Sequence, residues 1–378
     1  MLDTIKLTIP SKMCSFLDTK MFLPENTNAL RGYKTFVQNP TKSELLRGVY
    51  KPRLTITNRF NTFGRSEWTL SIELSLPKLL YRNNFDELSD NDFPEVIELL
   101  QSRLKEMGVK IFTAILEKAP VSSVHYSKNI PLTDGSTPHY YISKIKDANV
   151  PLLLDVNESS YQNDGCGFKW HANSYEVAFY DKIHDLGKAK ISDKRAFEND
   201  NSLQLDLFEA FQERKQFEVL RMEVRLNNRQ KTRKLFKTLG IRAELNFSEV
   251  FSTGISRKVL LYYIDEMAKR RPIIMDSSAN PKDFLASLIV ENPTLGLRKT
   301  FAICGLKQAL EAMDIRELRG MFEKYGNRSW SKFISESNSI KIKRLNDPFA
   351  FIRSNIETFM PLKLVDFQGK MINNDKYD

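Results

Sequence analysis

Two short runs decide the fold class of this chain: Tyr175-Glu-Val-Ala-Phe-Tyr-Asp-Lys182 and Leu220-Arg-Met-Glu-Val-Arg-Leu226. In both runs apolar and polar residues alternate, so each is predicted to be a strand with one apolar face and one polar face. The polar faces carry Glu176, Tyr180, Arg221, Glu223 and Arg225. If the two strands share a sheet, a tyrosine, a carboxylate and two arginines gather on the face away from the core. That combination suits chemistry on a phosphodiester.

The chain is basic for its size. Its 378 residues include 57 Lys and Arg against 47 Asp and Glu, which gives a formal net charge of +10. A chain of this length can bury a sizeable core and favours two domains. The positive charge favours a polyanionic partner such as nucleic acid, because clustered cations gain affinity by releasing its counterions. The alternative is a mildly basic soluble protein with no such partner.

The cysteines and the apolar runs indicate the compartment. Cys14, Cys166 and Cys304 are far apart and form no CxxC pair, which argues against a zinc ribbon or a disulfide framework and favours a reducing environment. No apolar run approaches the roughly 20 residues that span a bilayer. Residues 2–9 alternate like a first strand and lack a signal-peptide pattern. We therefore expect a cytoplasmic protein without membrane contact.

Strand-like alternation dominates the first half of the chain, and the predicted strands include residues 2–9, 53–58, 69–76, 121–128 and 140–144. Asp92 is expected to cap a helix that runs to about Met107. From about Phe247 onward the apolar spacing is mostly helical. The sequence thus predicts an α+β fold, with an antiparallel sheet flanked by helices and a mainly helical C-terminal region. The predicted boundaries are 1–245 for the first domain, 246–368 for the helical domain and 369–378 for a tail.

Four predicted strands each place one notable residue on the polar face, namely Glu73, His125, Tyr180 and Glu223. Two carboxylates and a histidine could bind a divalent metal, since Mg²⁺ and Mn²⁺ favour oxygen ligands and Mn²⁺ accepts imidazole. Such a metal would polarise a phosphate. Tyrosine, with an ordinary pKa of about 10, is a poor nucleophile at neutral pH. A metal or the nearby Lys182 could favour its phenolate.

The same residues also have structural interpretations. Tyr180 could serve as amphipathic packing at a strand end, His125 as a structural histidine, and Glu223 as part of a solvated ion-pair ladder. These interpretations remain open beside the catalytic ones.

Several cations are candidates for phosphate contacts. Arg221 and Arg225 could clamp phosphates with two hydrogen bonds each. The basic run 228–234 is either a solvated surface or a DNA contact, and its cations are Arg229, Lys231, Arg233 and Lys234. No GxxxxGK[ST] loop is present, so a P-loop nucleotide site is not expected.

The order of these segments resembles the rolling-circle replication initiators of the gene II/X family of filamentous phages. It is more distantly similar to the Rep proteins of staphylococcal-type plasmids. The resemblance covers residues from about 1 to 340. It rests on the opening strand Met1–Pro10, on Ile72-Glu-Leu-Ser-Leu-Pro-Lys78, on Phe179-Tyr-Asp-Lys182, and on Leu220–Leu226 leading to Leu235-Phe-Lys-Thr-Leu-Gly240. Two features depart from the pattern. His125 stands where many relatives carry an acidic residue, and the two-histidine motif of better-known rolling-circle nucleases is lacking.

The resemblance implies that residues 1–245 form a nicking–joining domain and that residues 246–368 bind DNA or assist it. Tyr180 would attack the scissile phosphate, form a 5′-phosphotyrosine link and leave a 3′-hydroxyl that primes a host polymerase. A second transesterification would close the displaced strand without ATP. Lys182 would neutralise charge near the phosphate. The implied metal is Mg²⁺ or Mn²⁺, held by Glu73, His125 and Glu223.

The implied partners are single-stranded or hairpin origin DNA and a host helicase and polymerase in a bacterial cell. Two other functions remain open at this stage. A replicon-encoded DNA-binding regulator would need neither Tyr180 nor Glu223 for anything beyond binding. A metal-dependent nuclease that uses water would need Glu73 and Glu223 but not Tyr180.

Overall fold

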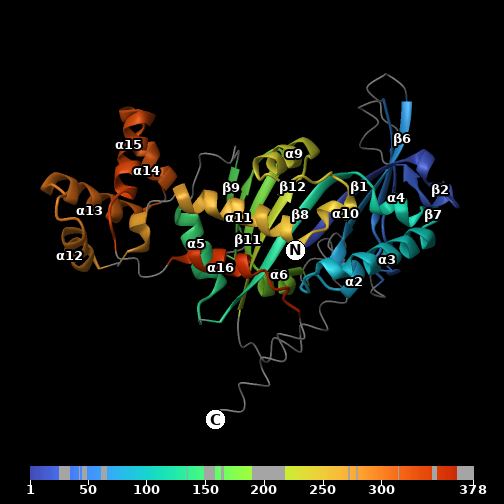
Figure 1. Cartoon of the computed structure of the whole chain (residues 1–378), viewed down its shortest axis with the longest axis horizontal. Coiled ribbons are helices and arrows are strands. Elements are labelled where there is room, and N and C mark those ends of the chain that lie inside the picture. The colour runs from blue at the N-terminus through green and yellow to red at the C-terminus, as the bar shows by residue number, and fades with distance from the viewer. Residues whose placement is uncertain are drawn as a thin grey trace, which may run out of the picture.

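Ten strands form one antiparallel sheet, in the order β3-β4-β5-β6-β1-β8-β12-β11-β10-β9 (Figure 1). The computed structural model describes residues 1–24, 35–41, 43–44, 49–60, 66–133, 135–148, 158–162, 166–189, 218–270, 273–277, 280–313, 315–342 and 347–363. The α+β fold with an antiparallel sheet, helices around it and a mainly helical C-terminal region is confirmed.

The strands of the sheet are β1 (Leu2–Pro10), β3 (Leu23–Pro24), β4 (Thr35–Gln38), β5 (Arg53–Phe60), β6 (Ser66–Ser75), β8 (Val121–Leu132), β9 (Glu158–Gln162), β10 (Gly167–His171), β11 (Tyr175–Asp181) and β12 (Glu218–Leu226). A separate pair joins β2 (Ser15–Phe16) to β7 (Val109–Lys110). The helices of the sheet half are α2 (Leu76–Tyr81), α3 (Phe93–Glu106), α4 (Thr113–Glu117), α5 (Pro138–Ala148), α6 (Lys182–Ala189), α9 (Arg229–Thr238), α10 (Phe247–Val250), α11 (Thr253–Arg270) and α16 (Pro348–Thr358).

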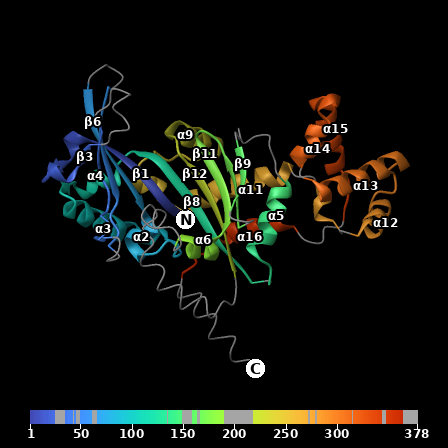
Figure 2. The same ribbon diagram turned by 180° about the vertical axis from the view of Figure 1, so that it is seen from behind.

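Helices cover the apolar face of the sheet. Met222 and Val224 of β12 are fully buried on this face, and the Tyr175 ring of β11 lies 5.7 Å from the Tyr263 ring of α11. In Figure 1, helices α9 and α11 lie in front of the strands, and in Figure 2, from behind, β1, β8 and β12 come forward. The apolar alternation read from the sequence therefore faces the helices, as predicted.

A buried ion pair provides hydrogen bonds to the part of β8 that extends beyond the start of β1. Strand β1 starts beside Tyr126, and Met1 before it exchanges backbone hydrogen bonds with Ser127. The residues of β8 beyond Ser127 lack a neighbour from this segment. Glu87 fills this place: its carboxylate accepts from the Asn129 backbone N–H at 2.6 Å and from Lys128 Nζ at 2.5 Å. The segment that follows α2 thereby completes the hydrogen bonding of a strand in the middle of the sheet.

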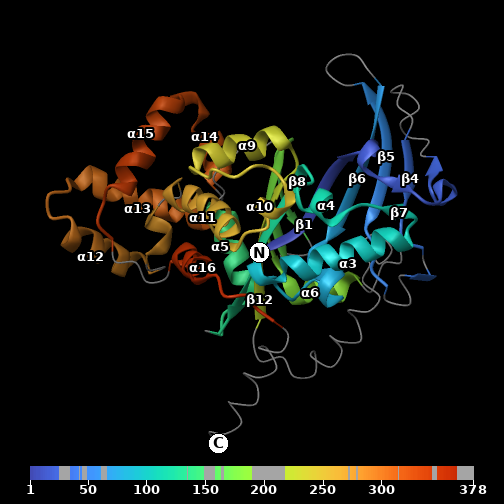
Figure 3. The same ribbon diagram turned by 45° about the vertical axis from the view of Figure 1, so that its right-hand side comes forward.

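The C-terminal helices belong to two different cores. Phe247 of α10, Ile264 of α11 and Ile352 of α16 pack in the same core as Val224 of the sheet. Helices α12 (Pro281–Glu291), α13 (Leu297–Ala312), α14 (Ile315–Met321) and α15 (Asn327–Asn338) share a second core, around Leu288. Figure 3 shows these four helices set to one side of the sheet. We call residues 280–342 the helical unit.

The structure thus differs from the predicted boundary at residue 245. The core of the sheet continues through α11 and resumes at α16, and the helical unit lies between them in the chain. Chain order alone could not show this, because the last helix returns to the first core. The predicted tail, residues 369–378, lies outside the described residues.

Two local predictions had different outcomes. The helix expected after Asp92 is confirmed as α3, although the Asp92 carboxylate bonds the Ser89 backbone N–H instead of capping α3. The strand expected at 140–144 is wrong, because these residues lie in α5. Pro138 opens that helix, a position that suits its fixed φ, and buried Tyr141 and Ile145 one turn apart anchor it to the core.

Candidate active site

Strand pairing brings the predicted site residues onto one polar face. Tyr180 of β11 lies opposite Arg221 of β12, and Arg225 of β12 lies opposite His125 of β8. Residues paired directly across antiparallel strands point to the same side of a sheet. Glu223, between the two arginines in the alternation, therefore shares this face with Tyr180 and His125.

Glu223 is the centre of the cluster and is only 2% exposed. The Tyr180 hydroxyl donates to its Oε2 at 3.0 Å, and Arg225 donates to both of its oxygens, from Nε at 2.9 Å and from Nη2 at 3.1 Å. Burial alone would raise the pKa of Glu223, but the charge and hydrogen bonds of Arg225 outweigh it and hold the pKa well below its usual range. Glu223 is therefore a carboxylate that orients the tyrosine hydroxyl.

Tyr180 is a neutral phenol in this arrangement. Burial and the neighbouring Glu223 raise its pKa well above the ordinary value, and the charge of Arg221 only partly opposes them. The expectation that Lys182 favours the phenolate is not met in this state. Its ammonium lies 5.9 Å from the centre of the Tyr180 ring.

Lys182 is itself an unusual lysine. It begins α6 directly after β11 and is 1% exposed. Burial, aided by the positive charge of Arg221, lowers its pKa from 10.5 to about 7. Among the described residues it makes no hydrogen bond or ion pair. Its ammonium lies near the Tyr180 ring, and the charges of Asp185, Asp3 and Glu223 partly oppose the lowering of its pKa. Its side chain can therefore gain or lose a proton near neutral pH.

His125 lies on the other side of Glu223. Its Nδ1 is 3.6 Å from Glu223 Oε1, and its Nε2 is 3.2 Å from Asn227 Oδ1. Burial lowers the pKa of His125 below its ordinary value despite the nearby Glu223, so the ring is neutral at neutral pH. A neutral imidazole beside a carboxylate is a chemically suitable pair of metal ligands.

The third predicted ligand, Glu73, does not join this pair. Glu73 of β6 lies opposite Lys6 of β1, and the Lys6 Nζ is 3.4 Å from its Oε2. Two strand intervals, roughly 10 Å, separate β6 from β8. Among the described residues, no three His, Cys, Asp or Glu side chains are grouped so that they could hold a metal. The structure therefore does not assemble the set of Glu73, His125 and Glu223.

Arg221 is buried and has partners inside the protein, in contrast to its predicted role as a phosphate clamp. Its Nη2 lies 3.1 Å from Asp3 Oδ1 and donates to Ser127 Oγ at 2.9 Å. Its Nη1 donates to the Asn84 carbonyl oxygen at 3.1 Å and to Asn129 Oδ1 at 3.2 Å. Strand alternation identified the correct face, but only the register of β1 and β8 reveals that this end of the face is covered. Arg221 therefore links β12 to β1 and β8 through buried contacts.

Glu176 is a member of the cluster that sequence reasoning left out. It is buried, and its carboxylate pairs with Arg225 Nη1 at 2.8 Å, with His171 Nδ1 at 3.3 Å and with Lys169 Nζ at 3.6 Å. The alternation of β11 already placed Glu176 on the same face as Tyr180. Its link to Arg225 followed only from the pairing of β11 with β12.

The basic run forms helix α9, which Asn228 caps by accepting from the Gln230 and Lys231 backbone N–H groups. Leu235 and Phe236 pack into the apolar core, so the helix lies across the apolar face, away from Tyr180. The exposed cations of α9 are Arg229, Arg233, Lys234 and Lys237. Lys231 is half-buried, with its ammonium 4.0 Å from the centre of the Tyr175 ring, and is a packing residue.

A scan against models of known protein families finds no match, and searches of curated proteins and of solved structures find none either. No helix in the described part of the chain has both the length and the apolar character needed to cross a membrane.

Proposed function

We propose that this protein is a DNA nicking–joining enzyme that initiates rolling-circle replication, with Tyr180 as its nucleophile. The proposal depends most on one observation: the Tyr180 hydroxyl donates to the buried carboxylate of Glu223 at 3.0 Å. Cations surround this pair, with Arg225 on the carboxylate and Lys182 beside the tyrosine ring. A hydroxyl oriented by a carboxylate, with cations nearby, suits attack on a phosphodiester.

In the proposed reaction, Tyr180 Oη forms a bond to the scissile phosphorus as the bond from phosphorus to the 3′ oxygen breaks. The phenolic proton passes to solvent while Glu223 orients the hydroxyl, and the 3′ oxygen takes a proton from solvent. The phosphotyrosine link retains the energy of the broken bond, so rejoining to a 3′-hydroxyl requires no ATP. A phosphate bound beside Lys182 would stabilise the charged form of that lysine, and the ammonium would neutralise the developing charge.

A metal fits this site only in part. Glu223 and neutral His125 are suitable donors in kind, but hydrogen bonds from Tyr180 and Arg225 already occupy the Glu223 oxygens. The described residues supply no third ligand. The requirement for Mg²⁺ or Mn²⁺ therefore stays a prediction, and no step above passes through a metal.

The proposal includes single-stranded or hairpin origin DNA as substrate, and a host helicase and polymerase in the bacterial cytoplasm as partners. The polar face offers half-exposed cations for the DNA backbone, including Lys6, Lys169 and Arg225. Such contacts give affinity and register without reading sequence. Arg229 is exposed at the start of α9. It comes two residues after Asn227, whose side chain contacts His125 at the end of the polar face.

Covalent capture tests the proposal. Purified protein would be incubated with Mn²⁺ and single-stranded DNA of its own replicon, then run on a denaturing gel. We expect a metal-dependent protein–DNA adduct that Tyr180→Phe abolishes and that Tyr140→Phe, a change at an exposed tyrosine of α5, leaves intact. Removing the Tyr180 hydroxyl costs one hydrogen bond, about 1 kcal/mol, so the variant should fold. An adduct that survives in Tyr180→Phe would move the nucleophile to another tyrosine.

The closed hydrogen bonding of Glu223 favours a second candidate, a replicon-encoded DNA-binding regulator without catalysis. In that case the cluster is a structural network in which both Glu223 oxygens already accept hydrogen bonds, from Tyr180 and Arg225. The same gel separates the two candidates. DNA binding by wild type with neither adduct nor cleavage would support the regulator, and cleavage without an adduct would indicate hydrolysis by water.

A further inference from the structure

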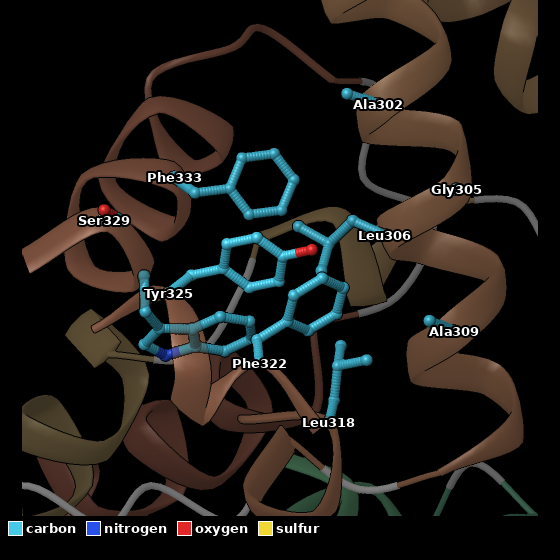
Figure 4. Close-up of a pocket in the computed structure, with 10 residues that line it drawn as sticks. Ala302, Gly305, Leu306, Ala309, Leu318, Phe322, Tyr325, Ser329 and Phe333 are labelled. Carbon is cyan, nitrogen blue, oxygen red and sulfur yellow. The ribbon is translucent and has the colours of Figure 1, made fainter. Parts of the chain in front are cut away.

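The helical unit contains a cavity of about 460 Å³ that none of the chemistry above uses. One wall is α13, where the small residues Ala302, Gly305 and Ala309 flank the larger side chain of Leu306. Large side chains form the opposite wall: in Figure 4, Phe322, Tyr325 and Phe333 project from the α14–α15 side towards α13. A Cβ added at Gly305 would meet no atom within 4 Å, so the space before this wall is open.

The aromatic wall is ordered by its own packing. The Phe322 ring stacks on Trp330 with centroids 6.1 Å apart and an interplanar angle of 25°, and it lies 5.8 Å from the Tyr325 ring. Trp330 is buried in the core of the unit, whereas Phe322 and Tyr325 are exposed. The cavity therefore has a fixed floor and an open, apolar mouth.

Exposed apolar side chains continue the surface beyond the cavity. Leu297 and Phe301 lie one turn apart on α13, with Gly305 one turn further on, and Met321 precedes Phe322. Leu297, Phe301 and Met321 are all exposed. Contiguous exposed apolar side chains of this kind are unfavourable in water and mark interaction sites.

Basic side chains flank the same surface. Arg298, Lys324, Arg328 and Lys332 are exposed, and none of the four has an acidic partner in the part of the chain that the structure describes. Two other cations of the unit are paired: Lys299 lies 3.5 Å from Glu336, and Lys307 lies 2.5 Å from Glu311. Arg328 and Lys332 are one turn apart on α15, beside Ser329 and Phe333 of the cavity lining.

We propose that this cavity docks an acidic amphipathic helix of another protein. An apolar side chain of the partner enters the space before Gly305, and carboxylates on its flanks meet Arg298, Arg328 and Lys332. This is the helix-in-groove mode of recognition, in which apolar anchors supply affinity. The flanking positive charges favour a partner with negative charge and raise the rate of association.

An unpaired base of single-stranded DNA fits less well, although it is also flat and attached to an anion. The side-chain polar groups of the lining are the hydroxyls of Tyr325 and Ser329 and the indole N–H of Trp330. On entering the cavity, the polar edge of a base would lose its hydrogen bonds to water and find few partners in exchange. Each unsatisfied group costs about 1–3 kcal/mol. An apolar side chain incurs no such cost.

A peptide titration tests the proposal independently of any DNA chemistry. The probe is a fluorescein-labelled synthetic helix of about five turns, with Leu along one face and Glu along the rest. Fluorescence anisotropy with the full-length protein should show saturable binding that weakens as salt is raised. Gly305→Leu should reduce the affinity at least about tenfold. It fills the cavity and also favours helix formation by about 0.5–1 kcal/mol, so lost binding would not reflect unfolding.

The matched control is Gly320→Leu on α14. Gly320 lies two residues from both Leu318 and Phe322, so it faces the opposite side of the helix, and an added Cβ there also meets nothing within 4 Å. This variant should bind the peptide within about twofold of wild type. A peptide with Lys in place of Glu should bind more weakly than the acidic one.

Three outcomes would overturn the proposal: no saturable binding of the acidic peptide, equal binding by Gly305→Leu, or equal binding of the Lys peptide. Binding of an oligothymidine probe that Gly305→Leu weakens, while the peptide does not bind, would identify a nucleobase as the occupant instead.

Discussion

Replacing Lys182 with methionine should make the protein more stable and less active. Lys182 is 1% exposed, and its ammonium has no hydrogen bond or ion pair among the described residues. Burial lowers its pKa from 10.5 to about 7. Because one pKa unit corresponds to about 1.4 kcal/mol, keeping this lysine charged in the folded state costs about 5 kcal/mol. Methionine fills a similar volume without a charge.

The pH dependence has a definite sign. The folded-state pKa lies below the unfolded value, so between pH 7 and 10.5 the unfolded chain binds more protons at this site. The stability of the wild type therefore rises with pH through that window. Below about pH 7, Lys182 is charged in both states and its destabilising effect is at its maximum. Between about pH 6 and about pH 9, the wild type should gain about 2–3 kcal/mol relative to Lys182→Met.

Urea unfolding at several pH values measures this difference as the free energy of unfolding of each protein. Lys234→Met is the matched control, since Lys234 is exposed on α9 and is solvated in both states. It should follow the wild type at every pH. A constant difference between wild type and Lys182→Met across the range would refute the reasoning, because it would mean that Lys182 does not change its protonation on folding.

Three further predictions concern other parts of the chain. Glu87→Gln leaves the buried ammonium of Lys128 without its carboxylate and should lower the free energy of urea unfolding by about 3–5 kcal/mol. The charge of Lys128 lowers the pKa of Glu87 despite burial, so the wild type should lose this advantage as pH falls through the acidic range. Arg233→Glu with Lys234→Glu should weaken binding to a non-specific oligonucleotide and flatten its salt dependence; an unchanged salt slope would exclude α9 from the DNA contact. Gly108→Ala should lower thermal stability by about 1–2 kcal/mol, because Gly108 has a φ of +74° and a Cβ would approach the Asp18 backbone nitrogen to 3.3 Å; unchanged stability would contradict it.

Alternation predicted the fold class because a strand with one buried face shows its period directly in the sequence. β6, β11 and β12 lie where alternation placed them, with Ile72, Val177 and Val224 fully buried. The pattern failed at residues 140–144, where aromatic and branched residues resemble a strand. A turn of α5 buries Tyr141, Ile142 and Ile145 on one side, and so few residues cannot separate a helical period from a strand.

The sequence could predict which face of its strand each site residue occupies, but not which residues contact each other across strands. Alternation places Tyr180 and Glu223 on polar faces, but their contact depends on the register between β11 and β12. Sequence gives no register for strands separated by about forty residues. The missing strand order and register also explain the two wrong predictions. Glu73 shares the polar face but lies two strands from His125, and Arg221 pairs with Asp3 of β1.

Lys182 best separates a catalytic from a structural interpretation of the polar face. Glu223 and Arg225 satisfy each other, and a purely structural network is stable when all of its buried charges are paired in this way. Lys182 departs from that pattern, since it is buried beside Tyr180 with no hydrogen bond or ion pair among the described residues, and the charges of Asp185, Asp3 and Glu223 only partly offset its burial. Methionine at this position would serve a structural role better. Burial lowers the pKa of this lysine to about 7, and its place beside a nucleophile candidate is instead consistent with phosphate chemistry, because a bound phosphate would supply an anionic partner. Proton uptake at about pH 8 when single-stranded DNA binds to wild type, but not to Lys182→Met, would follow from this argument, and equal uptake by both would leave the structural interpretation standing.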